Sequence, residues 1–327
     1  MSEESLWFRV RHSSVPACEC QTDHARLEWI IRLFRKTGTE NCCGQCEGME
    51  RSGEKAMHSY YQIPSADLGK NAKIPLQVLG ESGEVFYELA LEMICEIEKN
   101  NASGKDTVMI CPVGPVGQYP IFTRLVNEKR LSLKNCWFIN MDEYLTDDSE
   151  YIDESSALSF RGFMDRVVYG QIDADLLMRA EQRIFPDPHA PEKIMERITD
   201  LGGVDLTVGG IGINGHLAFN EADPSLTPQE FAGLHTRVLD ITPETRTANA
   251  IGDLGGALED MPRKCITIGM AEILGSKRIR LGVFRDWHRA VVRRAAYGEI
   301  SAGFPVTLLQ AHPDARIYVN ANAARLP

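Results

Sequence analysis

Six short apolar runs between residues 107 and 319 constrain the fold of this chain more than any other feature. Most are continuously apolar rather than alternating, which is typical of parallel strands that helices cover on both faces. Segments with helical spacing separate them. The alternation predicts an α/β fold, namely a three-layer α/β/α sandwich around a mostly parallel, doubly wound sheet. The expected strands are Thr107–Cys111, Cys136–Ile139, Val204–Val208, Cys265–Ile268, Arg280–Phe284 and Arg316–Val319.

The clearest of the expected helices begins near Ser82, because serine often caps a helix N-terminus. Apolar side chains follow at helical spacing from Val85 to Ile97. The turn-forming run Asn100–Gly104 should end this helix. Further helices are expected at Gln118–Asn127, Pro191–Leu201, Trp287–Ala296 and Ala302–Leu309.

Residues 1–56 differ in composition from the rest and form a separate cysteine-rich extension, while residues 57–327 form the α/β domain. One short helix is expected in the extension, at Leu27–Arg35. The extension could hold a tetrahedral zinc, but C-x-C with C-x-x-C is a looser pattern than two C-x-x-C knuckles. We therefore expect no metal, and either a disordered tail or a mis-assigned start ahead of Met57. The cysteines concerned are Cys18, Cys20, Cys42, Cys43 and Cys46.

Charge and hydropathy exclude several classes of partner. Hydrophobic residues make up 43% and charged residues 25% of the 327 residues, as in an ordinary globular protein. The formal net charge of −11 argues against nucleic acid and anionic membranes, which require a basic face. No apolar run approaches the roughly 20 residues of a spanning helix. Because the residues from Met1 to Glu4 are acidic where a secretory signal is basic, we expect a cytoplasmic protein.

A glycine-rich run, Gly209–Glu221, follows the expected strand Val204–Val208. Glycines at a strand end allow a sharp turn and close approach of a ligand, and ligands bind at that edge of an open α/β sheet. His216 and Glu221 leave this loop together, and an imidazole with a carboxylate can move protons on a bound molecule.

The segment Asn140-Met141-Asp142-Glu143-Tyr144 repeats this layout, because two carboxylates follow the expected strand Cys136–Ile139. Together the two segments resemble the signatures of the glucosamine-6-phosphate deaminase/isomerase family, N-M-D-E-Y and G-x-G-x-D-G-H-x-A-F-N-E. The resemblance covers about residues 60 to 320. It departs at Asn214, where the family carries aspartate.

The resemblance implies roles for four catalytic residues. Asp142 would carry a proton between C2 and C1 through an enediol, and His216 would open the sugar ring. Glu221 and the residue at 214 would set the protonation state of the imidazole. Asn214 can accept a hydrogen bond but cannot take a proton. The alternatives are structural: Asp142 or Glu143 would start a turn, and Glu221 would cap the next segment.

The phosphate end departs further from the family. The family's P-T-G-G-T-P loop corresponds to Pro112–Tyr119, which lacks both threonines and gains Pro115, a residue without an N–H. Backbone amides near Gly114 and Gly117 could still bind an anion. Ile251 and Gly252 stand where the family carries an arginine, and the family lysine corresponds to His288 or Arg289. The substrate-binding residues expected on this basis are Gly114, Gly117, Glu143, Gly215, Arg246, His288 and Arg289.

The sequence thus predicts a deaminase-like aldose–ketose isomerase that uses neither metal nor cofactor. Its partner would be a small-molecule sugar phosphate, either an amino sugar phosphate or a close relative. The sequence does not decide whether the chain forms a homo-oligomer. Two alternatives stand beside this prediction. One is a non-catalytic relative that binds a sugar phosphate, which the change at Asn214 favours. The other is a hydrolase of the 6-phosphogluconolactonase type, which shares the G-x-G-x-D-G-H loop.

Overall fold

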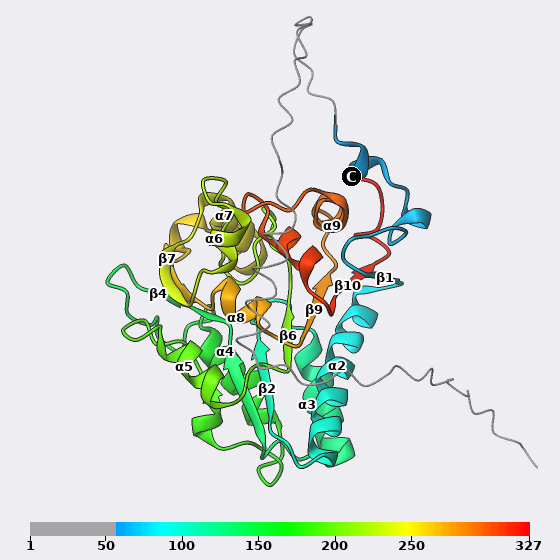
Figure 1. The fold of residues 1–327 in the computed structure, drawn as a ribbon. Coiled ribbons are helices and arrows are strands. Elements are labelled where there is room, and N and C mark those ends of the chain that lie inside the picture. The colour runs from blue at the N-terminus through cyan, green and yellow to red at the C-terminus, as the bar shows by residue number, and fades with distance from the viewer. Residues whose placement is uncertain (1–56) are drawn as a thin grey trace, which may run out of the picture.

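The computed structural model describes residues 57–327, so the cysteine-rich extension, its expected helix and its candidate zinc site lie outside the described residues. The described residues form a seven-stranded sheet and a three-stranded sheet (Figure 1). All neighbouring strands of the large sheet are parallel. In spatial order they are β1 (Leu76–Leu79), β10 (Ala315–Asn320), β9 (Arg278–Val283), β6 (Leu206–Gly209), β2 (Thr107–Cys111), β3 (Cys136–Asn140) and β5 (Arg183–Ile184).

Helices cover both faces of the large sheet, because successive side chains of each strand point to opposite faces. In β2, Val108 and Ile110 enter one core, while Met109 and Cys111 enter the other. The first core contains buried residues of α5 (Lys193–Asp200), α6 (Pro228–Ala232), α8 (Met270–Leu274) and α9 (His288–Tyr297). The second contains those of α2 (Ser82–Ala102), α3 (Gln118–Lys129) and α4 (Phe160–Val167). The expected three-layer sandwich is confirmed.

The small sheet is antiparallel and consists of β4 (Asp142–Leu145), β8 (Lys264–Thr267) and β7 (Arg237–Asp240). It has its own small core, which includes Tyr144 and Cys265, and α7 (Pro243–Asp253) contributes Ala250 to it. Figure 1 shows α7 and β7 together, apart from α2 and α3, which lie side by side. This sheet was not predicted from the sequence. Its strand β8 corresponds to the expected run Cys265–Ile268, which lies here rather than in the parallel sheet.

Two other expectations need correction. Ser82 is the first residue of α2, and Glu81 precedes it as the N-cap. The expected helix Ala302–Leu309 is instead a 3₁₀ helix, Pro305–Ala311, with proline in its first turn. Within residues 57–327, none of the helices combines the length and the hydrophobicity that a membrane span requires.

The strand order places a topological switch point between β2 and β6. From β2 the chain continues to β3 on one side, and from β6 it continues toward β9 on the other. The loops that follow these two strands therefore diverge and leave a crevice at their carboxyl ends, where ligands bind in open α/β sheets. The loop after β2 contains Gly114, and the loop after β6 contains His216.

Candidate active site

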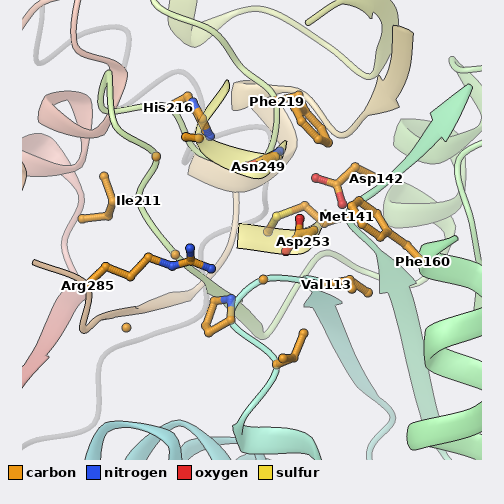
Figure 2. A pocket seen from close by; sticks show the side chains of 18 of the residues that line it. Val113, Met141, Asp142, Phe160, Ile211, His216, Phe219, Asn249, Asp253 and Arg285 are labelled. Carbon is orange, nitrogen blue, oxygen red and sulfur yellow. The ribbon is translucent and has the colours of Figure 1, made fainter. Parts of the chain in front are cut away.

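A pocket of about 550 Å³ lies at this switch point. The loops 113–117 and 210–213 form part of its wall, and Asp142, His216 and His288 also line it (Figure 2). Much of the remaining wall is apolar, including Phe86, Val113, Phe160, Phe163, Ile211, Ile213, Phe284 and Trp287. The structure thus brings Asp142 and His216 into one pocket from segments that are far apart in the sequence.

Asp142 follows the strand β3, as expected, and it begins a second strand, β4, that was not expected. The chain leaves the large sheet after Asn140 and enters the small sheet at Asp142, which pairs with Thr267. Between them the Met141 N–H donates to the Cys111 carbonyl at 2.9 Å, and the Met141 carbonyl accepts from Ile268 at 2.8 Å. Burial, together with the neighbouring Glu143, raises the pKa of Asp142 well above its usual range. The raised pKa makes this carboxylate a stronger proton acceptor than an exposed aspartate.

Glu143 does not line the pocket, because consecutive residues of β4 point in opposite directions. Its fully buried carboxylate accepts hydrogen bonds from the backbone N–H groups of Tyr144, Phe160 and Arg161 at 2.8 to 3.0 Å. The Ser159 hydroxyl also donates to it, at 3.0 Å. Glu143 therefore fixes the first turn of α4 rather than a substrate.

Two glycines shape the loop that carries His216. A Cβ at Gly212 would lie 2.0 to 2.3 Å from atoms of the His216 ring, so only glycine leaves room for the imidazole. Gly215 has a φ of +81°, and a Cβ there would lie 2.6 Å from the Phe304 ring. Gly215 does not line the pocket, so its role is conformational.

Behind the His216 ring, three polar side chains form a hydrogen-bonded group. Asn214 Oδ1 lies 2.7 Å from His216 Nδ1, and Asn214 Nδ2 donates to Glu221 Oε2 at 2.7 Å. The Thr245 hydroxyl donates to Glu221 Oε2 at 3.1 Å and lies 3.3 Å from His216 Nδ1. Neither Asn214 nor Glu221 lines the pocket, so both act on a ligand only through the imidazole.

This group fixes the tautomer of His216. The Asn214 amide must present its nitrogen to the Glu221 carboxylate, because a carboxylate is an acceptor only. Its oxygen then faces Nδ1, which must carry the proton. Nε2 of His216 is consequently the unprotonated nitrogen, free to accept a proton.

Glu221 is the negative charge of this group. Burial alone would raise the pKa of its carboxyl, but hydrogen bonds and charge from His216, with hydrogen bonds from Asn214 and Thr245, hold that pKa below its usual value. The Oε2 atom lies 3.4 Å from His216 Nδ1.

At the expected phosphate end, the loop after β2 is folded on itself and on the neighbouring loop. Gln118 Nε2 donates to the Pro115 carbonyl at 2.7 Å. Gly210 faces the Pro115 ring, and a Cβ there would lie 3.2 Å from it. Both Gly114 and Gly117 line the pocket, as expected.

His288 lines the pocket but is not a cation. Its Nδ1 accepts from the N–H groups of Phe284 and Arg285 at 3.1 and 2.9 Å, and Nε2 lies 3.0 Å from the Ile211 carbonyl. Burial and the nearby Arg285 outweigh the Ile211 hydrogen bond and lower the pKa of His288 to about 4. The neutral ring therefore joins the loops after β6 and β9.

Two arginines that were expected to bind the substrate contact other parts of the chain instead. Arg246 donates to the carbonyls of Leu258, Met261 and Pro262 at 2.8 to 3.1 Å. Arg289 donates to the side chain of Asn322 at 2.9 Å. Neither lines the pocket, and the structure gives both a structural contact instead.

Sequence reasoning missed several residues of the site. Thr245 begins the run Thr245-Arg246-Thr247-Ala248-Asn249, which is similar to a T-R-x-A-N stretch of the family and was the one available signal for it. Asp253 and Phe160 line the pocket without any motif to mark them. Arg285 also lines it, and Figure 2 shows its side chain extending into the pocket.

Curated relatives in sequence are glucosamine-6-phosphate deaminases. The protein of that name from Clostridium perfringens is 32% identical over 252 residues, which cover 74% of this chain and 95% of the relative. The chain belongs to the glucosamine-6-phosphate deaminase family. A deaminase from Bacillus velezensis is likewise 32% identical over 249 residues, with 74% and 95% covered. No family model matches the chain.

Solved structures of this family and of a second enzyme class share the fold. A monomeric glucosamine-6-phosphate deaminase of the NagB superfamily superposes with a TM-score of 0.67 at 26% identity, covering 77% of this chain and 99% of that one. A 6-phosphogluconolactonase from Thermotoga maritima gives 0.56 at 12% identity, with 75% and 98% covered. The lactonase likeness shows the fold alone.

Proposed function

We propose that this chain opens and isomerises an amino sugar phosphate, glucosamine 6-phosphate or a close relative, and releases the C2 amino group as ammonia. One observation carries the proposal. Asp142 and His216, from two separate segments, line the same pocket, and the imidazole is backed by Asn214, Glu221 and Thr245. The curated relatives carry the name of this reaction.

Ring opening falls to His216. Its unprotonated Nε2 accepts the proton of the anomeric hydroxyl, and the imidazolium so formed returns a proton to the ring oxygen. The charge on the imidazolium is transient, and the carboxylate of Glu221 at 3.4 Å stabilises it. Asn214 keeps Nδ1 as the donor throughout, because its oxygen accepts from that atom.

Isomerisation falls to Asp142. The open-chain sugar must lose a proton from C2 and gain one at C1, and a single carboxyl can do both if its pKa lies near the working pH. Burial moves the pKa of Asp142 upward, in that direction. This proton transfer leaves an imine at C2; water then adds to C2 and supplies its oxygen, and departure of ammonia leaves the ketose phosphate.

The change from aspartate to Asn214 does not remove the negative charge from the imidazole's surroundings. Glu221 supplies that charge, and Asn214 links it to the ring by donating to Oε2 and accepting from Nδ1. This arrangement supports a catalytic chain rather than a purely binding relative.

A substrate panel tests the proposal. Glucosamine 6-phosphate, free glucosamine and 6-phosphogluconolactone are each incubated with the full chain, and ammonia, ketose and acid release are measured. We expect ammonia and ketose in equal amounts from the first. Acid release from the lactone with no ammonia from the amino sugars would replace the deaminase with a lactonase. Binding without turnover of any of the three would leave only the non-catalytic relative.

A further inference from the structure

We infer that Arg285 is the residue that binds the anionic group of the substrate, and that Gly252 provides the surface on which its guanidinium rests. The inference rests on the proposed function, since it assigns the phosphoryl group of that substrate to a specific side chain. It also names a residue for which the family pattern gives no signal.

The first argument is the distribution of cations around the pocket. Of the arginines considered in this region, Arg246 and Arg289 donate to carbonyl and amide oxygens outside the pocket. His288 is neutral. Arg285 lines the pocket, and within residues 57–327 its guanidinium has no hydrogen bond or ion pair. A guanidinium that faces a pocket without a partner can bind an anion through two parallel N–H groups.

The second argument is the contact with α7. A Cβ at Gly252 would lie 2.9 Å from Nη1 of Arg285, so the glycine leaves the space that the guanidinium occupies. The preceding residue, Ile251, stands where the family's arginine is expected, and it is an exposed side chain. Arg285, which lies in the loop after β9, therefore reaches the part of α7 at which the family pattern places an arginine.

The third argument is that the backbone of Arg285 is fixed. Its N–H donates to His288 Nδ1 at 2.9 Å, and His288 Nε2 lies 3.0 Å from the Ile211 carbonyl. The loop that carries the guanidinium is thus joined to the loop that leads to His216. Because the base of the side chain is held, less freedom is lost when the guanidinium binds an anion.

Asp253 is the acidic side chain whose interaction with Arg285 bears on this proposal. It lines the same pocket, and Arg285 is the charge that acts on its carboxyl most strongly. Burial raises the pKa of the Asp253 carboxyl, while the positive charge of Arg285 opposes that rise.

The test measures KM and kcat for ammonia release from glucosamine 6-phosphate, with calorimetric titration of the same ligand. Arg285→Ala should raise KM and the dissociation constant by about 100-fold with little change in kcat, because two charge-assisted hydrogen bonds are lost. Arg285→Lys should recover part of that loss. The matched control is Arg289→Ala, whose guanidinium binds Asn322, and it should leave both constants within about twofold.

A double-variant cycle tests the role of Gly252. Gly252→Ala should weaken binding severalfold in the wild-type chain by displacing the guanidinium, and should have no effect in the Arg285→Ala chain. Unchanged binding in Arg285→Ala, with the thermal unfolding of both chains alike, would overturn the inference.

The outcome separates this inference from the proposed function. If the wild-type chain releases no ammonia but binds glucosamine 6-phosphate through Arg285, the proposed function fails and the anion site stands. If ammonia release is intact while Arg285→Ala binds as well as the wild type, the function stands and the anion site fails. If the wild-type chain does not bind glucosamine 6-phosphate, both the proposed function and the anion site fail.

Discussion

At one end of the pocket, polar side chains bind one another, while at the other extends an arginine whose guanidinium has no partner among residues 57–327 (Figure 2). Around His216, the side chains of Asn214, Glu221 and Thr245 are joined by hydrogen bonds of 2.7 to 3.3 Å. Arg285 lines the same pocket as the apolar side chains of Ile211, Phe284 and Trp287, and its guanidinium lies close to Gly252.

The difference shows which part of the chemistry depends on fixed geometry. Proton transfer requires a defined tautomer, and the hydrogen bonds of Asn214, Glu221 and Thr245 fix that of His216. Anion binding needs only a charge and N–H donors within reach, and different side chains can supply them. The proposed proton-transfer end keeps the residues of the family motifs apart from Asn214, while the proposed anion end departs from the family pattern at several positions.

The largest expected effect is on the proton-transfer end. Asp142→Asn should lower kcat for ammonia release by about 10³-fold with little change in KM, because an amide cannot carry the proton between C2 and C1. Steady-state kinetics on glucosamine 6-phosphate measures it. A loss confined to KM would mean that Asp142 binds the substrate and does not transfer a proton.

The same variant should change stability with pH. Because the pKa of Asp142 is raised in the folded chain, the unfolded chain loses this proton first as pH rises. Stability due to the protonated form is complete below about pH 4 and falls as pH rises through the folded-state pKa. Asp142→Asn escapes this loss, so its melting temperature should match the wild type at pH 4 and exceed it at pH 8. Equal melting temperatures at both values would contradict the raised pKa.

At Asn214, two substitutions separate shape from charge. Asn214→Leu removes both hydrogen bonds and should lower kcat by about 10²-fold, because Nδ1 loses its acceptor and the tautomer is no longer fixed. Asn214→Asp places a second carboxylate beside Glu221, so that the pair shares a proton. Its kcat should stay within about tenfold of the wild type, and the acidic limb of the pH profile should move to higher pH. Similar losses in both variants would show that position 214 does not set the tautomer.

At the anion end, removal of the acidic side chain of Asp253 should improve substrate binding. Asp253→Asn removes a carboxyl that acts on Arg285, so it should lower KM for glucosamine 6-phosphate severalfold while kcat stays the same. Free glucosamine serves as the control ligand, because it lacks the anion. A rise in KM for both ligands would assign Asp253 to the sugar hydroxyls or the amine instead.

The smallest effect is expected from removal of the cysteine-rich extension. Every strand of the large sheet comes from residues 76–320, so a chain that begins at Met57 should keep the melting temperature and activity of the full chain. Calorimetry and the ammonia assay compare the two. Stoichiometric zinc in the full chain, lost when Cys43 and Cys46 are both changed to Ser, would contradict the expectation of no metal there.

The sequence located the pocket because each predicted motif follows a strand of one parallel sheet, and the carboxyl ends of such strands share an edge. It assigned Asp142 to catalysis and Glu143 to substrate binding, but nothing in the motif shows on which side of the chain each carboxylate lies. The strand β4 decides between them: alternate side chains point to opposite sides, so one faces the pocket and the other faces α4.

The side chain of Arg285 shows a second limit of prediction from the sequence. Its reach into the pocket depends on the space left by Gly252, more than thirty residues earlier in the sequence, and no local pattern encodes that contact. The small sheet was missed for a related reason. Its strand β8 is buried at Cys265, Ile266 and Thr267, so its sequence has the continuous apolar character of a parallel strand.

The most direct test of the central claim is the reaction of glucosamine 6-phosphate in deuterated water, followed by ammonia assay and by NMR of the ketose product. If Asp142 carries the proton from C2 to C1, the wild-type chain releases ammonia and the product contains solvent deuterium at C1, because the carboxyl exchanges its proton with water during the transfer. In the same time Asp142→Asn should yield about 10³-fold less ammonia and labelled ketose. Ammonia release by Asp142→Asn at a rate close to that of the wild type, with the same labelling, would contradict the assignment of Asp142 as the proton carrier.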